Sequence, residues 1–264
     1  MDTKALRQKV LDLAIRGKLV PQDPNDEPAS VLLERIRAEK QRLVKEGKLK
    51  AKDIKGDTII FVGDDNLHYE KYADGSVKCI EDEIPFELPE GWSWVRLSSI
   101  AEMSLGKMLD AAKNKGTSQK YLRNVNVRWG CFDLSDVLEM RFEEDEAERF
   151  TITQGDLVVC EGGEPGRCAI WTSDKAIYYQ KALHRVRPIL VLSGFLYYVM
   201  RGFIGAGTYD RYYTGTTIKH LTNQSMKMLP IPLPPISEQQ RIVDSLDTIQ
   251  KQIDRIEIAK TDVK

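Results

Sequence analysis

The segment between Gly106 and Trp129 carries side chains suited to contact with a nucleic acid. It holds six basic residues against one acid, Asp110, and adds Asn124 and Asn126. Lysine and arginine bind phosphate oxygens, and amide side chains donate to and accept from base edges. The segment therefore indicates a nucleic-acid contact, although a solvated loop that leads into a strand has the same composition.

A second polar segment covers residues 205–221. It places three tyrosines, four threonines, Arg211 and Lys219 between glycines. Loops of this composition often form hydrogen bonds to polar polymers. A plain exposed loop explains the composition about as well, so the segment adds to the first one without deciding its role.

Sequence motifs of catalysis and metal binding are missing. There is no G-x-x-x-x-G-K-[ST] phosphate loop, G-x-S-x-G elbow, H-E-x-x-H or Asn-Pro-Pro-aromatic motif. Residues 161–167 are glycine-rich but lack the lysine-serine end of a phosphate loop, so they predict a tight turn. The four cysteines show no C-x-x-C spacing and the three histidines are far apart, which predicts reduced, mostly buried thiols and no metal site. An enzyme with an unrecognised site stays open as an alternative.

Composition predicts a globular protein with an uneven charge distribution. The chain has 264 residues, of which 42% are hydrophobic and 30% charged. It lacks a long apolar run and a signal-like start, which predicts a cytoplasmic protein without a membrane span. A net charge of −1 argues against a surface that attracts nucleic acid everywhere. The basic segment is followed by eight acids between Asp133 and Arg149, so one face is expected to be basic.

These segments must be positioned by helices and strands, and the residue patterns predict an α+β fold. Helices are expected over 3–17 and from Val31 to about Gly47, followed by a small β hairpin around Asp74-Gly75. From residue 88, short β-like runs alternate with turns, and the first of them contains Trp94, Val95 and Leu97. A buried helix is expected after Ser193 as its cap, with Gly202 or Gly205 as its stop.

The C-terminal segment predicts an extended proline-rich strand and then a long helix. Prolines up to Pro235 exclude a helix before Ile236, and Ser237 with Gln240 forms a capping-box pattern. At about 1.5 Å per residue, a helix from there to Lys264 spans roughly 40 Å. Apolar residues along it repeat at steps of four and three, as in a coiled-coil seam, at Ile242, Leu246, Ile249, Ile253, Ile256 and Val263.

Such a seam needs a partner, which lies either in this chain or on another one. No glycine cap follows Val263. We therefore expect either the start of a longer helix or a half-length protein that pairs with itself.

Several stretches together resemble the specificity subunit of type I restriction-modification systems. They follow one another in the order expected for that family and cover nearly the whole chain. The stretches are "LPEGWSWVRLSSIAEM", "YLRNVNVRWG", "FTITQGDLVVCEGGEPGRCAIW", "YYTGTTIKHLT" and "PIPLPPISEQQRIVDSLD".

The resemblance implies a protein without chemistry of its own. Full-length members carry two target recognition domains, each of which reads one half of a split double-stranded DNA site, and conserved helices set the distance between them. Methyltransferase (modification) subunits and a restriction/translocase subunit join the complex and would bind S-adenosylmethionine, ATP and Mg²⁺. This chain has one such domain, so it resembles an N-terminal fragment or a half-subunit that forms a homodimer through its C-terminal helix.

Domain boundaries and site residues follow from the resemblance. The domains are a conserved helical arm at 1–57, a β-hairpin lead-in at 58–87, the target recognition domain at 88–232 and the start of a spacer helix at 233–264. The DNA contacts are expected at Lys107, Lys113, Lys115, Lys120, Arg123, Asn124, Asn126, Arg128, Tyr212, Thr214, Thr216 and Lys219. The alternative is a coiled-coil scaffold whose globular domain binds protein rather than DNA.

Overall fold

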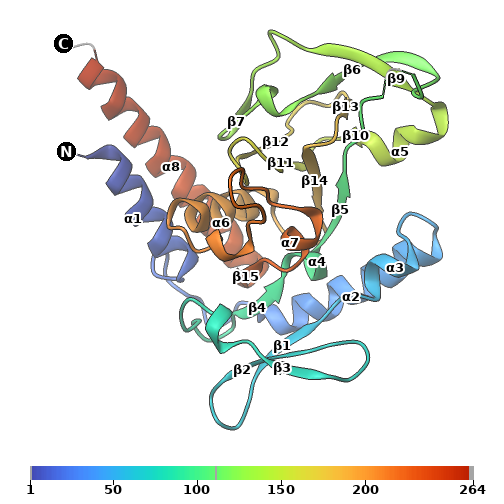
Figure 1. The fold of residues 1–264 in the computed structure, drawn as a ribbon. Helices are drawn as coiled ribbons and strands as arrows, with labels where there is room; N and C mark the ends of the chain where they lie inside the picture. The colour runs from blue at the N-terminus through green and yellow to red at the C-terminus, as the bar shows by residue number, and fades with distance from the viewer. Residues whose placement is uncertain (1, 111, 262–264) are drawn as a thin grey trace.

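The computed structural model describes residues 2–110 and 112–261, and Figure 1 shows their arrangement. Helix α1 (Thr3–Ile15) is capped by the Asp2 carboxylate, and Gly17 follows it with φ +65°, as the sequence predicted. Helix α2 (Ala29–Lys45) likewise ends before Gly47, whose φ is +73°. A single further turn, α3 (Ala51–Ile54), leads out of this helical arm.

The predicted hairpin is part of a three-stranded antiparallel sheet with the order β1-β2-β3. Gly75 has φ +85° in the turn between the last two strands, which explains the Asp74-Gly75 signal. Strand β1 comes from the "TIIFV" run and adds a third strand to the hairpin. The elements are β1 (Ile59–Val62), β2 (His68–Lys71), β3 (Val77–Cys79) and the 3-10 turn η1 (Glu81–Glu83).

The middle of the chain contains two four-stranded sheets. The first has the order β12-β11-β14-β5 and the second β10-β13-β6-β9, with β13 and β6 as the parallel pair. Short helical turns η2, η3 and α5 connect the strands, and β7 and β8 form a separate two-stranded ribbon. The bounds are β5 (Ala101–Leu105), β6 (Thr117–Leu122), η2 (Asn124–Asn126), β7 (Val127–Arg128), β8 (Cys131–Phe132), β9 (Leu138–Phe142), η3 (Glu144–Glu146), α5 (Ala147–Phe150), β10 (Thr151–Ile152), β11 (Leu157–Cys160), β12 (Cys168–Ile170), β13 (Ile177–Tyr179) and β14 (Leu183–Pro188).

Strand β11 shows how the layers stack. All four of its side chains are buried, and alternate residues enter different cores. Leu157 and Val159 join a large core shared with the helices, whereas Val158 and Cys160 join a smaller core shared with the second sheet. The β11 sheet is therefore a central layer between helices and strands.

Helix α6 (Ser193–Gly205) confirms the predicted buried helix, but its ends differ from the expectation. Leu192 is the cap residue, and the Ser193 hydroxyl donates instead to the carbonyl of Gly155. The left-handed residue after the helix is Gly207, with φ +73°. Gly202 lies inside the helix, where a Cβ would stand 3.4 Å from the Leu11 side chain, so it permits close packing of α6 on α1.

The prolines before the last helix form a strand, β15 (Pro230–Leu233), which pairs antiparallel with β4 (Ser93–Arg96). The Pro230 carbonyl accepts a hydrogen bond from the Tyr209 hydroxyl, so the polar backbone groups of Pro230 face away from β4. Pro232 shares that side by the alternation of a strand, and its missing N–H removes no ladder bond. Leu97, expected in the strand, instead begins the short helix α4 (Leu97–Ile100), and the 3-10 turn η4 (Asp210–Tyr212) and helix α7 (Asn223–Lys227) precede β15.

Helix α8 (Ile236–Thr261) starts one residue before the predicted cap. The Ser237 hydroxyl donates to Asp26, and Gln240 bonds to Asp244, so the expected capping box does not form. Figure 1 shows α8 beside α1, with both chain termini at the same end of the pair. The two helices therefore run antiparallel. No helix in the described part of the chain is both long enough and apolar enough to cross a membrane.

Seam residues of α8 contribute to this packing. Ile242, Leu246 and Ile253 are buried inside this chain, while Ile249 and Ile256 are half-buried. Arg7 of α1 reaches across to α8, where it donates to Gln250 and pairs with Asp254 at 2.8 Å. Val263 lies outside the described residues. Between Ile242 and Ile253, the seam is thus covered by helices of the same chain.

Candidate nucleic-acid interface

The glycine-rich turn at 161–167 joins the two segments that the sequence selected. Gly163 and Gly166 have φ +76° and +88°, which confirms the predicted tight turn. Asn124 Nδ2 donates to the Gly162 carbonyl at 3.1 Å, and Arg167 Nη2 donates to the Asn124 carbonyl at 3.0 Å. These bonds hold the first segment on one side of the turn.

The second segment is bonded to the other side of the same turn. The amide of Leu221 donates to the Glu161 carbonyl at 2.7 Å, and the Tyr213 hydroxyl donates to the Pro165 carbonyl at 3.2 Å. Two segments almost a hundred residues apart in sequence therefore meet at one turn.

The basic segment lies against the acidic one that follows it, because β6 pairs antiparallel with β9. Lys120 stands directly opposite Glu139 in this register. Further pairs join Arg123 to Asp136 at 2.7 Å and Arg128 to Asp133 at 3.6 Å. The expected basic face is consequently only partly formed, since acids of 133–146 neutralise part of it.

Lys107 is the most buried of the basic residues in this segment, with 8% of its surface exposed. Its ammonium group pairs with Glu146, donates to the Arg141 carbonyl and lies 5.1 Å from the centre of the Phe142 ring. Hydrogen bonding to Lys107 helps to lower the pKa of Glu146, against the opposing effect of its burial. The Lys107 side chain therefore stabilises the domain and does not face solvent.

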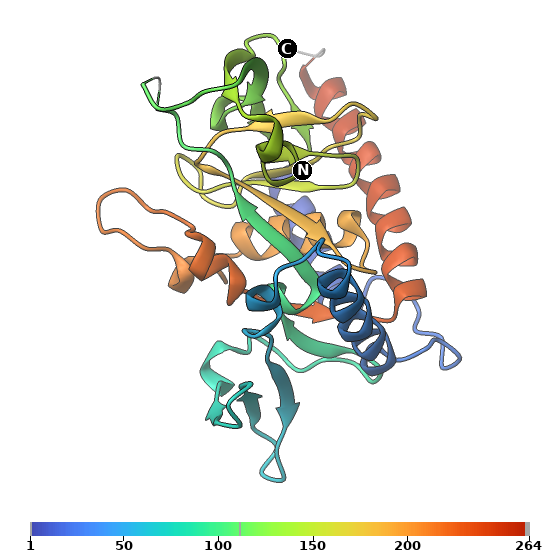
Figure 2. The same cartoon turned by 90° about the vertical axis from the view of Figure 1, so that its right-hand side faces the viewer.

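Three other lysines are exposed. Lys113 and Lys115 lie on the loop between β5 and β6, and Lys120 lies on β6. The Lys113 side chain is 85% exposed, and its ammonium nitrogen lies 3.4 Å from the Asp110 carboxylate. Figure 2 shows the β5–β6 loop projecting on the side of the molecule opposite α8.

The two asparagines have different positions. Asn126 is 2% exposed; its side chain accepts from the Arg123 amide and donates to the carbonyls of Asp133 and Asp136. It thereby fixes the backbone of η2. Asn124 is half-buried, and its Oδ1 has no hydrogen-bond partner among the described residues.

The predicted residues of the second segment also separate into two groups. Tyr212 is half-buried, and its hydroxyl donates to Glu83 at 3.0 Å, which ties η4 to the lead-in sheet. Thr214, Thr216 and Lys219 are exposed on the loop that follows. This loop projects to the same side as the β5–β6 loop (Figure 2).

Two residues outside the predicted contact set shape this region: Trp129, which belongs to the polar segment that the sequence selected, and Arg167, which sequence reasoning missed. Trp129 donates from Nε1 to Glu164 at 2.7 Å, and Arg167 pairs with the same carboxylate at 2.9 Å. The position of Arg167 directly after the glycine-rich turn was the available signal. Its Nε is buried without a partner in the described structure, as is that of Arg123.

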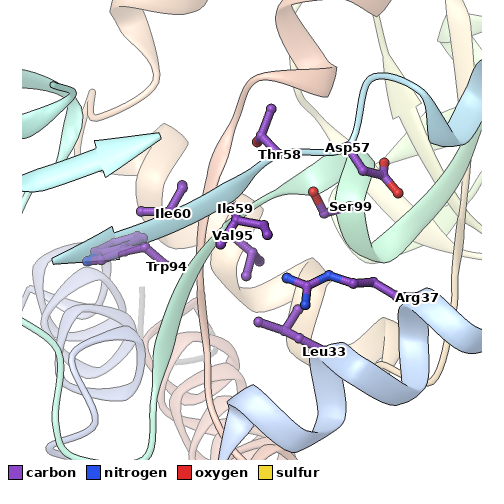
Figure 3. Close-up of a pocket in the computed structure, with 9 residues that line it drawn as sticks. All are labelled: Leu33, Arg37, Asp57, Thr58, Ile59, Ile60, Trp94, Val95 and Ser99. Atoms are coloured by element: carbon purple, nitrogen blue, oxygen red, sulfur yellow. The ribbon is translucent and has the colours of Figure 1, made fainter. Parts of the chain in front are cut away.

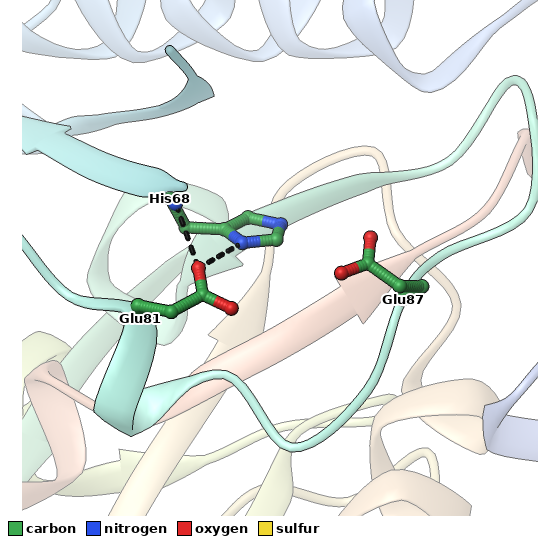
Figure 4. Close-up of side chains that lie close together, drawn as sticks. All are labelled: His68, Glu81 and Glu87. Atoms are coloured by element: carbon green, nitrogen blue, oxygen red, sulfur yellow. Dashed lines mark hydrogen bonds and ion pairs between the residues drawn. The ribbon is translucent and has the colours of Figure 1, made fainter. Parts of the chain in front are cut away.

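The side chains of His68, Glu81 and Glu87 form a cluster of the residue types that bind metal ions. Their ligand atoms lie within 4.8 Å of one another (Figure 4). Glu81 Oε2 already accepts the His68 amide at 2.8 Å and lies 2.7 Å from Nδ1, and this hydrogen bonding lowers the pKa of Glu81. The other ring nitrogen of His68 faces Glu87, so the cluster offers at most three residues, and Glu81 is already engaged by His68. A structural zinc site uses four ligands.

Cysteines add no ligands to that cluster. The four thiols are free, and Cys160 and Cys168 are buried as predicted. Cys79 and Cys131 are exposed, so the expectation of mostly buried thiols was wrong for them.

A small pocket lies between α2, β1 and β4. Figure 3 shows Leu33, Arg37 and Asp57 among the side chains around it. Its volume is about 30 Å³, enough for one or two water molecules and too small for a nucleotide-sized ligand. The polar segments on the projecting loops therefore form the stronger candidate site.

The described chain is an α+β domain with polar projecting loops, carried beside the long helix α8. Residues 89–263 match the family described as the type I restriction modification DNA specificity domain. The chain belongs to this family, which confirms the resemblance found in the sequence.

Two curated relatives come from Escherichia coli. The type I restriction enzyme EcoAI specificity subunit is 32% identical over 97% of this chain and 41% of its own length. The EcoEI specificity subunit is 31% identical over 96% of this chain and 40% of its own length. The chain therefore spans about two fifths of these relatives.

Two solved structures share the fold. The HsdS subunit from Thermoanaerobacter tengcongensis gives a TM-score of 0.52 at 19% identity, covering 87% of this chain and 50% of that one. A second structure was reported for complex assembly and conformational transition of the type I R-M system. One of its chains gives a TM-score of 0.55 at 17% identity, covering 99% of this chain and 53% of that one.

Proposed function

We propose that this chain is a DNA sequence-recognition component of a type I restriction-modification complex and reads one half of a bipartite site. The observation that carries the proposal is the convergence of two polar segments at the 161–167 turn, in a chain that belongs to the specificity family. Two loops of this region project from one side of the molecule, opposite α8. That side is the proposed DNA-facing side.

Exposure divides the expected contact residues into two roles. Exposed lysines are proposed to bind phosphate, and exposed threonines to approach base edges. Asn124 is proposed to hold the 161–167 turn, because its Nδ2 donates to the Gly162 carbonyl and its Oδ1 is buried. Lys107, Asn126 and Tyr212 are proposed to position these groups, because their polar atoms are bonded inside the domain. Arg123 and Arg128 would have to exchange their acidic partners for phosphate.

The chemistry of the complex is assigned to other subunits. We propose that methyltransferase subunits dock on the helical arm and on α8, and that a restriction/translocase subunit joins them. S-adenosylmethionine, ATP and Mg²⁺ would then be bound by those partners, in the cytoplasm. In this arrangement residues 1–57 form the conserved arm, 58–87 the lead-in, 88–232 the recognition domain and 233–264 the start of the spacer.

A bipartite site requires a second recognition domain, which further residues of a longer chain or a second copy of this one would supply. Homodimerisation through α8 is one source. The buried seam limits that contact to the half-buried and exposed positions near the end of α8, such as Ile256 and Ile258.

Salt-dependent binding tests the proposal. Lys115→Ala and Lys120→Ala should each weaken binding to duplex DNA and lower the slope of log K against log salt by about one unit if a phosphate contact is lost. Lys251→Ala, an exposed lysine on α8, is the matched control and should change neither quantity. Unchanged slopes for every exposed lysine of 113–120 would refute DNA binding here and favour the protein-binding scaffold.

A further inference from the structure

We propose that residues 214–220, called here the probe hairpin, enter the major groove of the target duplex with Ile218 against the thymine methyl of a recognised base pair. The inference rests on the proposed DNA-recognition function and adds to it a specificity-determining residue. Ile218 was not among the residues selected from the sequence.

The probe hairpin is a short loop closed at its base by one β-bridge. Thr214 and His220 exchange two backbone hydrogen bonds, with N···O distances of 2.9 and 2.8 Å. Gly215 has φ +88°, and a Cβ there would stand 2.3 Å from the Ile218 carbonyl oxygen. Only glycine fits this position, so the tight turn is built into the sequence.

The base of the probe hairpin is held by neighbouring elements. On one side, Leu221 and Tyr213 are bonded to the 161–167 turn. On another, Arg211 pairs with Asp82 at 2.7 Å, and Tyr212 donates to Glu83, both from the lead-in sheet. A base fixed on two sides presents its tip with little conformational entropy left to lose on binding.

The tip, by contrast, has an apolar side chain in solvent. Ile218 is 64% exposed, the highest value among the large hydrophobic residues of the described chain that are exposed. A single exposed isoleucine is unremarkable on most surfaces. Here its neighbours are the exposed hydroxyls of Thr216 and Thr217 and the Lys219 ammonium, which stands 5.5 Å from the centre of the Tyr213 ring.

The dimensions of DNA favour the major groove. The major groove is about 12 Å wide and admits elements as broad as a two-stranded ribbon, whereas the minor groove is about 6 Å wide and displays no thymine methyl. The major groove displays the thymine methyl, which an aliphatic side chain contacts, and threonine hydroxyls can bond to neighbouring base edges. Lys219 at the flank of the probe hairpin would then lie near the phosphate backbone.

The test begins with duplexes selected from a random pool by the full 264-residue chain, with a methyltransferase subunit of the same system present. Ile218→Ala should weaken binding to the selected duplex about tenfold and to a random duplex by less than about twofold. Replacing thymine by deoxyuridine at one position of the site should weaken wild-type binding similarly. The same replacement should have no further effect on the Ile218→Ala variant, because both changes remove one contact.

Val62→Ala is the matched control, because Val62 is 55% exposed but lies on β1 of the three-stranded sheet. It should bind as wild type does. The inference is overturned if Ile218→Ala keeps the selected sequence profile, or if no deoxyuridine position loses its effect in that variant. Absence of any selected sequence with the wild-type chain would instead overturn the proposed function itself, so the two failures are distinguishable.

Discussion

Replacing Arg96 by methionine should strongly destabilise the protein. Arg96 lies on β4 and is 1% exposed, and it joins the lead-in sheet to the main domain. Its guanidinium bonds to Glu70 at 3.0 and 2.6 Å, to Glu83 at 2.8 Å and to the Met228 carbonyl at 2.7 Å. Burial alone would lower the pKa of Arg96, but hydrogen bonds and charge from Glu70, with the charge of Glu83, raise it overall.

The magnitude follows from the group that the substitution leaves behind. Glu70 is 0% exposed, so Arg96→Met strands a carboxylate in the core. Breaking a buried ion pair in this way costs about 3–5 kcal/mol, whereas a chain of this kind has only about 5–15 kcal/mol of stability in total. Arg96→Met with Glu70→Met should recover part of the loss, because the carboxylate of the core is removed with its partner. Glu83, which also loses Arg96, is 11% exposed and keeps Lys78 at 3.4 Å and the Tyr212 hydroxyl.

Urea unfolding followed by the fluorescence of Trp92 and Trp94 measures this effect, since both indoles are buried near the joint. Arg211→Met is the matched control. Its partner Asp82 is 72% exposed, so the loss should be at most about 1 kcal/mol. The reasoning is refuted if Arg96→Met costs no more than Arg211→Met, or if the double variant is less stable than the single one.

Two further predictions concern α8. Ile253→Asp should lower the free energy of unfolding by about 3 kcal/mol, because this side chain is 2% exposed within the chain. Ile258→Asp should leave the free energy of unfolding nearly unchanged, because Ile258 is 62% exposed. A change in sedimentation without a loss of stability would instead place Ile253 at a contact between copies. Burial raises the pKa of Glu238 above its usual 4.5, so its protonated form stabilises the fold below that pH and this contribution is lost as the pH rises through the raised pKa. Glu238→Gln keeps an acceptor for the Trp92 indole and should be more stable than wild type by about 1 kcal/mol at pH 7.5. The difference should vanish near pH 4, where the wild-type carboxyl group is protonated. Thermal melts that give an equal difference at both pH values would contradict the assigned cause.

The sequence by itself determined the elements whose signals are local. Gly17, Gly47 and Gly75 stop helices or close a turn through positive φ, a property of single residues. The 193–205 helix and the C-terminal helix follow from apolar spacing, and the family follows from ordered stretches of sequence. Helix caps were predicted less well, because Ser193 and Ser237 found partners far away in the chain.

Tertiary structure alone decided which of the polar residues face solvent. Antiparallel pairing of β6 with β9 brings acids against the basic segment. Lys107 and Asn126 are buried and bonded to partners inside the domain. Nothing in a local window distinguishes Lys107 from Lys115, since the difference depends on Glu146, which lies 39 residues further along the chain.

The same holds for the partner of α8 and for the probe hairpin. The seam had to be covered, but only the packing of α1 and α6 placed the cover within this chain. Ile218 is a candidate DNA contact because its loop is closed at its base and exposed at its tip, and both properties depend on tertiary structure. Such properties are sums over contacts between residues distant in sequence, and the hydrophobic and charge patterns of one segment leave them undetermined.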